Sequence, residues 1–188
     1  GYSFEFTGQY KVLMNTVLEM AGAVFAAIIL IYLIMAMQFS SWLQPLIILL
    51  TIPLSLVGAL VALFVTRQGV DISVGMGAFT LVGIAVNNAI VLMDYANKER
   101  RSGTPFHDAL ISAATVRLRP ILLTSLTTIF ALLPVAIGTT VGSKIFQPFA
   151  ITVIGGLLSA TCATLIVVPT LSRCLMERKK PIATTGYP

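Results

Sequence analysis

The amino-acid sequence predicts an all-α membrane protein with five transmembrane helices and one amphipathic helix at the cytoplasmic interface of the membrane. Composition is the first reason, because 57% of the 188 residues are hydrophobic and only 10% are charged, whereas a soluble domain has about 25% charged residues. The mean hydropathy of +0.95 agrees. The net charge of +5 comes from basic residues that flank apolar segments, so it does not indicate a nucleic-acid-binding surface.

Five apolar segments are the second reason, since each is long enough to cross a bilayer at roughly 20 residues per helix. In chain order they run from about Thr16 to Met37, Pro45 to Val65, Val74 to Asn97, Leu118 to Gly138 and Phe146 to Leu175. The resulting division of the chain is the end of an extracytoplasmic region (1–15), three spans (16–97), a cytoplasmic link (98–117), two spans (118–177) and a cytoplasmic tail (178–188).

Each span has its own sequence character. The first contains the unbroken apolar run 23–30, and the second follows a short link around Trp42. The third is apolar except for a few polar residues at helical spacing, and the fifth is rich in small residues. Pro53, Pro134 and Pro169 each remove a backbone donor within or near a span, which is compatible with hinges or with fixed bends.

The link at 98–117 is expected to contain a separate surface helix. Thr104 is a suitable N-cap with Pro105 at the first helical position. Apolar residues then recur at helical spacing until the chain turns into the fourth span at Arg119-Pro120. The only histidine, His107, lies in this link without a partner at metal-ligand spacing, so no metal site is expected.

Basic residues predict the orientation of the spans. Nine of the twelve lie in or beside the link and after the fifth span, and these two regions share one side of the membrane when the number of spans is odd. The positive-inside rule makes that side cytoplasmic. Lys11, Arg67 and Lys144 remain on the other side, so the N-terminus of the chain is expected to face outward.

Polar residues in the third and fourth spans are the candidates for function. Thr80, Asn87 and Asp94 are spaced seven apart and project from nearly one helix face, with Asn88 about a hundred degrees away. The fourth span has a matching stripe, with Thr127 beside it: Arg117, Thr124 and Thr128. Polar side chains in hydrocarbon need partners, so these residues either join helices or line a path for an ion. Asp94 can also be solvated or paired with an arginine near the inner interface.

Small residues in the fifth span indicate close helix packing. They form two adjacent small-xxx-small rows, Gly155-Ser159-Ala163 and Gly156-Ala160-Thr164. The sequence has no P-loop, no Ser/His/Asp set and no cluster of metal ligands. These observations favour movement of protons or ions over covalent catalysis, and they predict neither enzyme activity nor a bound cofactor.

Four segments resemble the C-terminal membrane half of resistance-nodulation-division (RND) efflux pumps of the hydrophobe/amphiphile type. They are GYSFEFTG (1–8), FSSWLQP with TIPL (39–45 and 51–54), the stretch 83–97, and RLRPILLTS (117–125). The first resembles the last strand of the periplasmic porter region, and the others resemble the start of the ninth span, the tenth span and the start of the eleventh. The resemblance covers about residues 1–180 and implies that the five spans correspond to the eighth to twelfth.

The resemblance also implies a set of ion-relay residues, driven by the proton gradient as energy source. In the family, two Asp on the fourth span meet a Lys on the tenth and a Thr and an Arg on the eleventh. The Lys position matches Asn87, and the Asn that follows it matches Asn88. Thr124 and Arg117 match the other two positions, and the possible accessory residues are Asp94, Thr80 and Thr128.

Asn87 departs from the best-known pumps because an amide cannot carry the positive charge of Lys, although it still donates and accepts hydrogen bonds. We therefore expect the charge balance of the relay, and with it the number of ions moved per cycle, to differ from those of the best-known pumps. The heavy-metal branch of the family has a Glu near this point, which this chain lacks, so amphiphilic substrates are favoured over metal ions.

The implied partners are the rest of the same polypeptide, which would supply the Asp pair and the porter loops, further copies in a homotrimer, a periplasmic adaptor with an outer-membrane channel, and the lipid bilayer. The implied location is the bacterial cytoplasmic (inner) membrane, with several spans. Two alternatives stay open. One is a lipid exporter or protein-export accessory of the same fold, and the other is a non-transporting membrane scaffold whose polar stripes only join helices.

Overall fold

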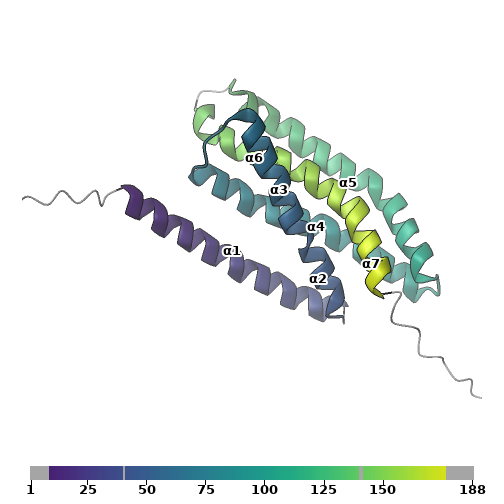
Figure 1. Cartoon of the computed structure of the whole chain (residues 1–188). Coiled ribbons are helices and arrows are strands. Elements are labelled where there is room, and N and C mark those ends of the chain that lie inside the picture. Colours follow the sequence, from purple (N-terminus) through teal and green to yellow (C-terminus); the bar gives the residue numbers. More distant parts are fainter. Residues whose placement is uncertain (1–8, 40, 140–141, 177–188) are drawn as a thin grey trace, which may run out of the picture.

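The computed structural model describes residues 9–39, 41–139 and 142–176, and all elements within these residues are helices (Figure 1). They are α1 (Gln9–Phe39), α2 (Leu43–Leu49), α3 (Thr51–Thr66), α4 (Ile72–Arg101), α5 (Phe106–Ile137), α6 (Ser143–Cys162), the π-helix η1 (Ala163–Val167) and α7 (Val168–Met176). The expected porter strand at 1–8 and the tail at 178–188 lie outside the described residues.

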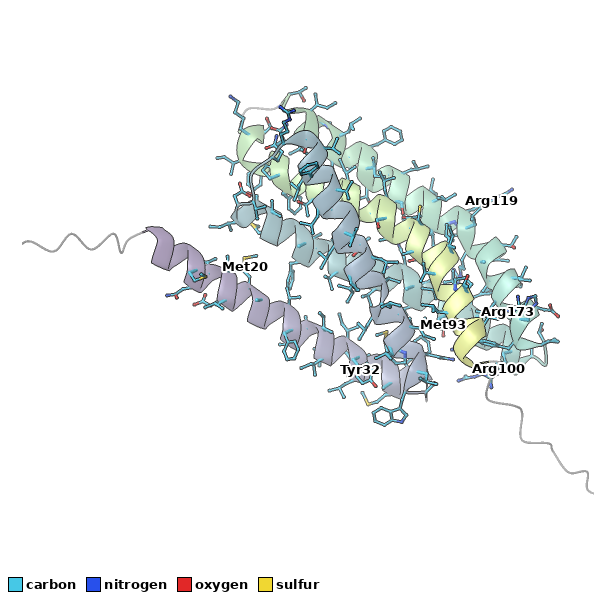
Figure 2. All side chains as sticks on the ribbon, in the orientation of Figure 1. Met20, Tyr32, Met93, Arg100, Arg119 and Arg173 are labelled. Carbon is cyan, nitrogen blue, oxygen red and sulfur yellow. The ribbon has the colours of Figure 1, made fainter. Side chains whose placement is uncertain are left out.

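The all-α class and the five spans are confirmed. Five helical stretches are long and apolar enough to cross a membrane: Met14–Phe39, Leu43–Thr66, Ile72–Arg101, Phe106–Ile137 and Ser143–Arg173. The second consists of α2 and α3, and the fifth consists of α6, η1 and most of α7. Arg100 and Arg173 lie at the same end of the bundle (Figure 2), as expected when two basic clusters share one side.

The link differs from the expected separate surface helix, because residues 106–117 continue into the fourth span as one helix, α5. Its apolar side packs on the end of α4, where Leu110 and Ala113 form a buried cluster with Ala96. Pro105 occupies the N-cap position expected for Thr104. Pro120 does not interrupt the helix, since a single missing backbone bond is tolerated in membrane helices.

Helix α6 is the centre of the bundle, since it packs against α3, α4 and α5. The closest approach is to α3, where a Cβ added at Gly155 would overlap the Cβ of Ala62 and lie 2.9 Å from the carbonyl oxygen of Gly58. The Ser159 hydroxyl donates across this contact to the carbonyl of Leu54 at 2.6 Å. Absence of a side chain at Gly155 is therefore what allows the two backbones to meet.

Helix α1 lies along one edge of the bundle, in contact with α2 and α4 (Figure 1). Most of its described side chains are exposed or half-buried, but Met35 and Phe39 near its C-terminal end are buried. These two side chains join the largest core cluster, which also contains Ile48 of α2 and Leu92 and Met93 of α4. The firm anchorage of α1 is thus confined to the end that leads into α2.

Two of the prolines coincide with breaks in regular α-helix. Leu50 separates α2 from α3, three residues before Pro53. The π-helix η1 ends two residues before Pro169, and the Val168 N–H donates to the carbonyl of Ala163, five residues back. A proline has no N–H and its ring presses on the carbonyl four residues earlier, so proline contributes to both breaks. Pro134, by contrast, lies inside the unbroken helix α5.

Candidate functional site

The polar stripe of α4 lies partly on the outside of the described bundle. Thr80 and Asn87 are exposed and Asp94 is half-buried. The Thr80 hydroxyl donates to the carbonyl of Met76 in its own helix at 3.0 Å. Among the described residues, the side chain of Asn87 has no hydrogen-bond partner and Asp94 has no ion pair. An exposed amide within a membrane-spanning helix marks a surface that needs another polar group against it.

Asn88 has a different environment from its neighbour Asn87. Its side chain is 8% exposed, and its Nδ2 is buried without a hydrogen-bond partner in the described structure. Helices α4 and α6 run in parallel, because Gly77 faces Thr152 and Leu81 faces Gly156. Asn88 comes two helical turns after Leu81, so its side chain lies on the same face of α4 and at about the same depth as η1. The two amides therefore serve different surfaces of α4.

The hydroxyl of Thr164, on η1, is also buried without a partner in the described structure. Thr164 follows Gly156 by eight residues, as Asn88 follows Leu81 by seven, so both polar groups lie at about the same depth. Buried unpaired polar groups are rare in native proteins, and each costs about 1–3 kcal/mol. Four buried side-chain polar atoms have no hydrogen-bond partner among the described residues, and two of them, on Asn88 and Thr164, lie at this depth on α4 and the π-helix.

The α5 stripe carries one charge and several hydroxyls. Arg117 is half-buried, and its guanidinium lies 5.3 Å from the centre of the Tyr95 ring on α4. Thr124 is exposed, and its hydroxyl donates to the carbonyls of Pro120 and Ile121 in its own helix at 3.1 and 3.0 Å. The contact between Arg117 and Tyr95 joins α5 to α4 through a cation–π interaction.

The interpretation of the α5 threonines as links between helices finds no support in their hydrogen bonds. Thr127 and Thr128 donate to backbone carbonyls of α5 itself, Thr128 to Thr124 at 2.8 Å. Both instead line a groove of about 380 Å³ between α4, α5 and α6. Its full lining is Thr80, Ile84, Thr127, Thr128, Ala131, Leu132, Phe149 and Val153. Three threonine side chains therefore border this open space.

Two further sets of side-chain hydrogen bonds join helices, and they involve residues to which the sequence assigned no role. Gln44 of α2 and Asn97 of α4 exchange two amide hydrogen bonds of 2.9 and 2.8 Å. The hydroxyls of Ser125 and Thr161 meet at 2.9 Å between α5 and α6. Of these four residues, only Asn97 lies at the edge of a predicted span. Isolated serine and glutamine residues give no periodic signal, so the sequence does not distinguish those that join helices from those that face solvent.

No group of three or more His, Cys, Asp or Glu side chains able to hold a metal ion occurs in the described part of the chain. His107 contacts only the adjacent Asp108, at 3.2 Å. Cys162 is a free, exposed thiol.

Comparison with known proteins places this arrangement in a family. A family model described as the AcrB/AcrD/AcrF family matches residues 1–175. The chain belongs to this family. It is accordingly a membrane region of an RND-family transporter, and its helices are those of a multi-pass membrane protein. RND proteins with quite different names are similar to it, as the following relatives illustrate.

The swarming motility protein SwrC of Bacillus subtilis (strain 168) is 40% identical over 162 residues, which are 85% of this chain and 15% of SwrC. The multidrug resistance protein MdtC of Photorhabdus laumondii is 34% identical over 90% of this chain and 16% of MdtC. A crystal structure of a heavy metal efflux pump superposes with a TM-score of 0.78 at 30% identity, covering 92% of this chain and 17% of the pump. The chain thus spans about a sixth of the length of these proteins.

Proposed function

We propose that this chain is the C-terminal membrane part of a proton-driven exporter of amphiphilic or hydrophobic small molecules, and that it supplies half of an ion-relay site. The observation that carries the proposal is the unpartnered amide of Asn87, exposed in the middle of a membrane-spanning helix. Exposure to lipid would leave that amide unsatisfied at a cost of several kcal/mol. A second membrane half with carboxylates against this face supplies the missing partners.

In this mechanism, Asn87 is a hydrogen-bonding group and not a counter-ion. Its amide donates to a carboxylate and accepts from a protonated carboxyl group, so the bonds that it makes change when a proton arrives. Arg117, whose guanidinium lies over the Tyr95 ring, supplies a positive charge on α5. Thr124 lies on the same stripe of α5, two helical turns after Arg117. A change in bonding on one face of α4 then shifts this helix relative to the second membrane half.

The remaining features of the proposal concern the whole transporter. The substrate class is favoured by the similarity to MdtC, which is named a multidrug resistance protein. The working assembly is a homotrimer in the bacterial inner membrane, with a periplasmic adaptor and an outer-membrane channel in hosts that have an outer membrane. The end of the bundle that carries Arg100 and Arg173 faces the cytoplasm.

The test is Asn87→Leu in the full transporter, assayed by efflux of an amphiphilic fluorescent dye from energised cells. Efflux should fall to the level of cells treated with a protonophore, while expression of the folded protein stays at the wild-type level, because Asn87 contributes no bond within the described fold. Thr170→Val is the matched control, since that hydroxyl is also exposed and bonds only to its own helix. Unchanged efflux in Asn87→Leu, or efflux that resists the protonophore, would refute the relay.

A further inference from the structure

A wide groove lies on the side of α6 away from α4. It has a volume of about 970 Å³ and lies between α3, α5 and α6, with no residue of α4 in its lining. Its floor and walls are apolar for most of their length, with Val61, Ile154 and Leu158 as examples. The polar stripe of α4 requires cover by protein, whereas this apolar surface is suited to direct contact with lipid.

The groove is long enough to span one leaflet of the bilayer. On α6 its lining extends from Gln147 to Cys162, which at 1.5 Å per residue is about 22 Å. One leaflet contributes about half of the 30 Å hydrocarbon core. A single acyl chain that enters at the membrane surface can therefore lie within the groove along most of its length.

The chemistry of the groove changes at one end. The polar lining residues at that end are Thr66, the last residue of α3, Gln68, two residues further on, and Gln147 in the second turn of α6. Arg67 lies between the first two, in a left-handed conformation with φ of 54° that ends α3. Lys144 precedes Gln147 by three residues and so lies on the same side of α6.

Both cations at this end are available to a ligand. Arg67 and Lys144 are exposed, and neither has an ion pair among the described residues. The nearby carboxylate of Asp71 is engaged in capping α4, where it accepts from the Val74 N–H at 3.1 Å. The first turn of α6 has no side-chain cap, so its partial positive charge adds to that of the two side chains.

From these observations we propose that the groove is a binding site for an anionic phospholipid. The acyl chain lies between α3, α5 and α6, and the phosphate lies at Arg67 and Lys144. A neutral amphiphile would make no ionic contact with the two cations, and a soluble anion would make no contact with the apolar groove. The proposal is independent of the ion relay, because no relay residue lines the groove.

The experiment is native mass spectrometry of the full transporter, purified in mild detergent and reconstituted with defined mixtures of phosphatidylglycerol and phosphatidylcholine. The wild type should retain phosphatidylglycerol selectively. Arg67→Gln with Lys144→Gln should reduce this selectivity about 25-fold, since a basic residue near a membrane surface contributes roughly a fivefold preference for anionic lipid. Arg119→Gln, an exposed cation on α5 outside the groove, is the matched charge control.

A second variant tests the acyl-chain part separately. Leu158→Trp should fill the groove and displace lipid without a change in charge, whereas Leu123→Trp, at an exposed apolar position outside it, should retain lipid as the wild type does. Equal retention of both lipids by the wild type, or undiminished phosphatidylglycerol in the charge variant, would overturn the proposal. If Leu158→Trp fails to fold, the charge variant and its control still test the proposal. If another helix of the full transporter fills the groove, the wild type will bind no lipid, which would also overturn the proposal.

Discussion

Substitution of Gly155 by alanine should destabilise the transporter, because the contact between α3 and α6 has no room for a methyl group. The added Cβ would overlap Ala62 and lie 2.9 Å from the Gly58 carbonyl oxygen, whereas carbon contacts are best at about 3.5–4.0 Å. Overpacking of this kind costs about 1–3 kcal/mol. Separation of the helices also weakens the bond from Ser159 to Leu54, which is worth about 0.6 kcal/mol in a membrane.

The better helix propensity of alanine offsets up to about 1 kcal/mol of this cost. The net loss is therefore at least about 0.6–2.6 kcal/mol, to be measured as a lower melting temperature of the full transporter in detergent. Gly83→Ala is the control, because an added Cβ there has nothing within 4 Å, and it should be neutral or slightly stabilising. Gly156→Ala should fall between them, since its Cβ meets only the side chain of Leu81, which can change rotamer. A Gly155→Ala protein that melts no lower than Gly83→Ala would refute the close approach of α3 and α6.

Two further predictions concern polar groups in the same melting assay. Gln44→Leu should lower the free energy of unfolding by about 1–3 kcal/mol, because it leaves the Asn97 amide unpaired. The double variant Gln44→Leu with Asn97→Leu should recover part of that loss. Equal melting temperatures for the single and the double variant would argue against the reciprocal bond. Thr164→Val removes a buried hydroxyl that has no partner, so it should be neutral or stabilising by up to about 1 kcal/mol. Thr161→Val breaks the bond to Ser125 and should be destabilising by about 0.6 kcal/mol; the reverse order of these two threonine variants would contradict the assignment.

Hydropathy was sufficient to predict the five spans, because each needs only a long apolar run. The first was expected at Thr16–Met37 and is found at Met14–Phe39. The continuity of α5 was not predictable, since it depends on Leu110 and Ala113 packing against α4 and not on the local signal at Pro120. At Pro169 the sequence predicts a hinge or a bend but not a π-helix, because the local backbone geometry depends on the packing of the neighbouring helices.

For the candidate site, spacing alone placed Thr80, Asn87 and Asp94 on one face of α4. It could not assign Asn87 to the outside and Asn88 to the interior, because the choice depends on which side of α4 is covered by α6. The hydrogen bonds between helices were missed for a similar reason. Ser125 and Thr161 are 36 residues apart, and no local pattern indicates that their hydroxyls meet.

The packing of α6 suggests where a relay movement is absorbed. Its contact with α3 is made through backbone at Gly155 and Gly58, so any sliding there meets hard atoms. Its contact with α4 also involves backbone at one end, where a Cβ added at Gly77 would lie 3.0 Å from the Phe149 carbonyl oxygen and the Ser73 hydroxyl donates to the carbonyl of Ile145 at 2.7 Å. Further along, the contact is made through the flexible end of Leu81 and past the unpaired groups of Asn88 and Thr164. On the proposed relay, a change in bonding at Asn87 therefore moves the part of α4 beyond Leu81 across a stationary pair formed by α3 and α6, and this movement makes new bonds available to the two unpaired groups.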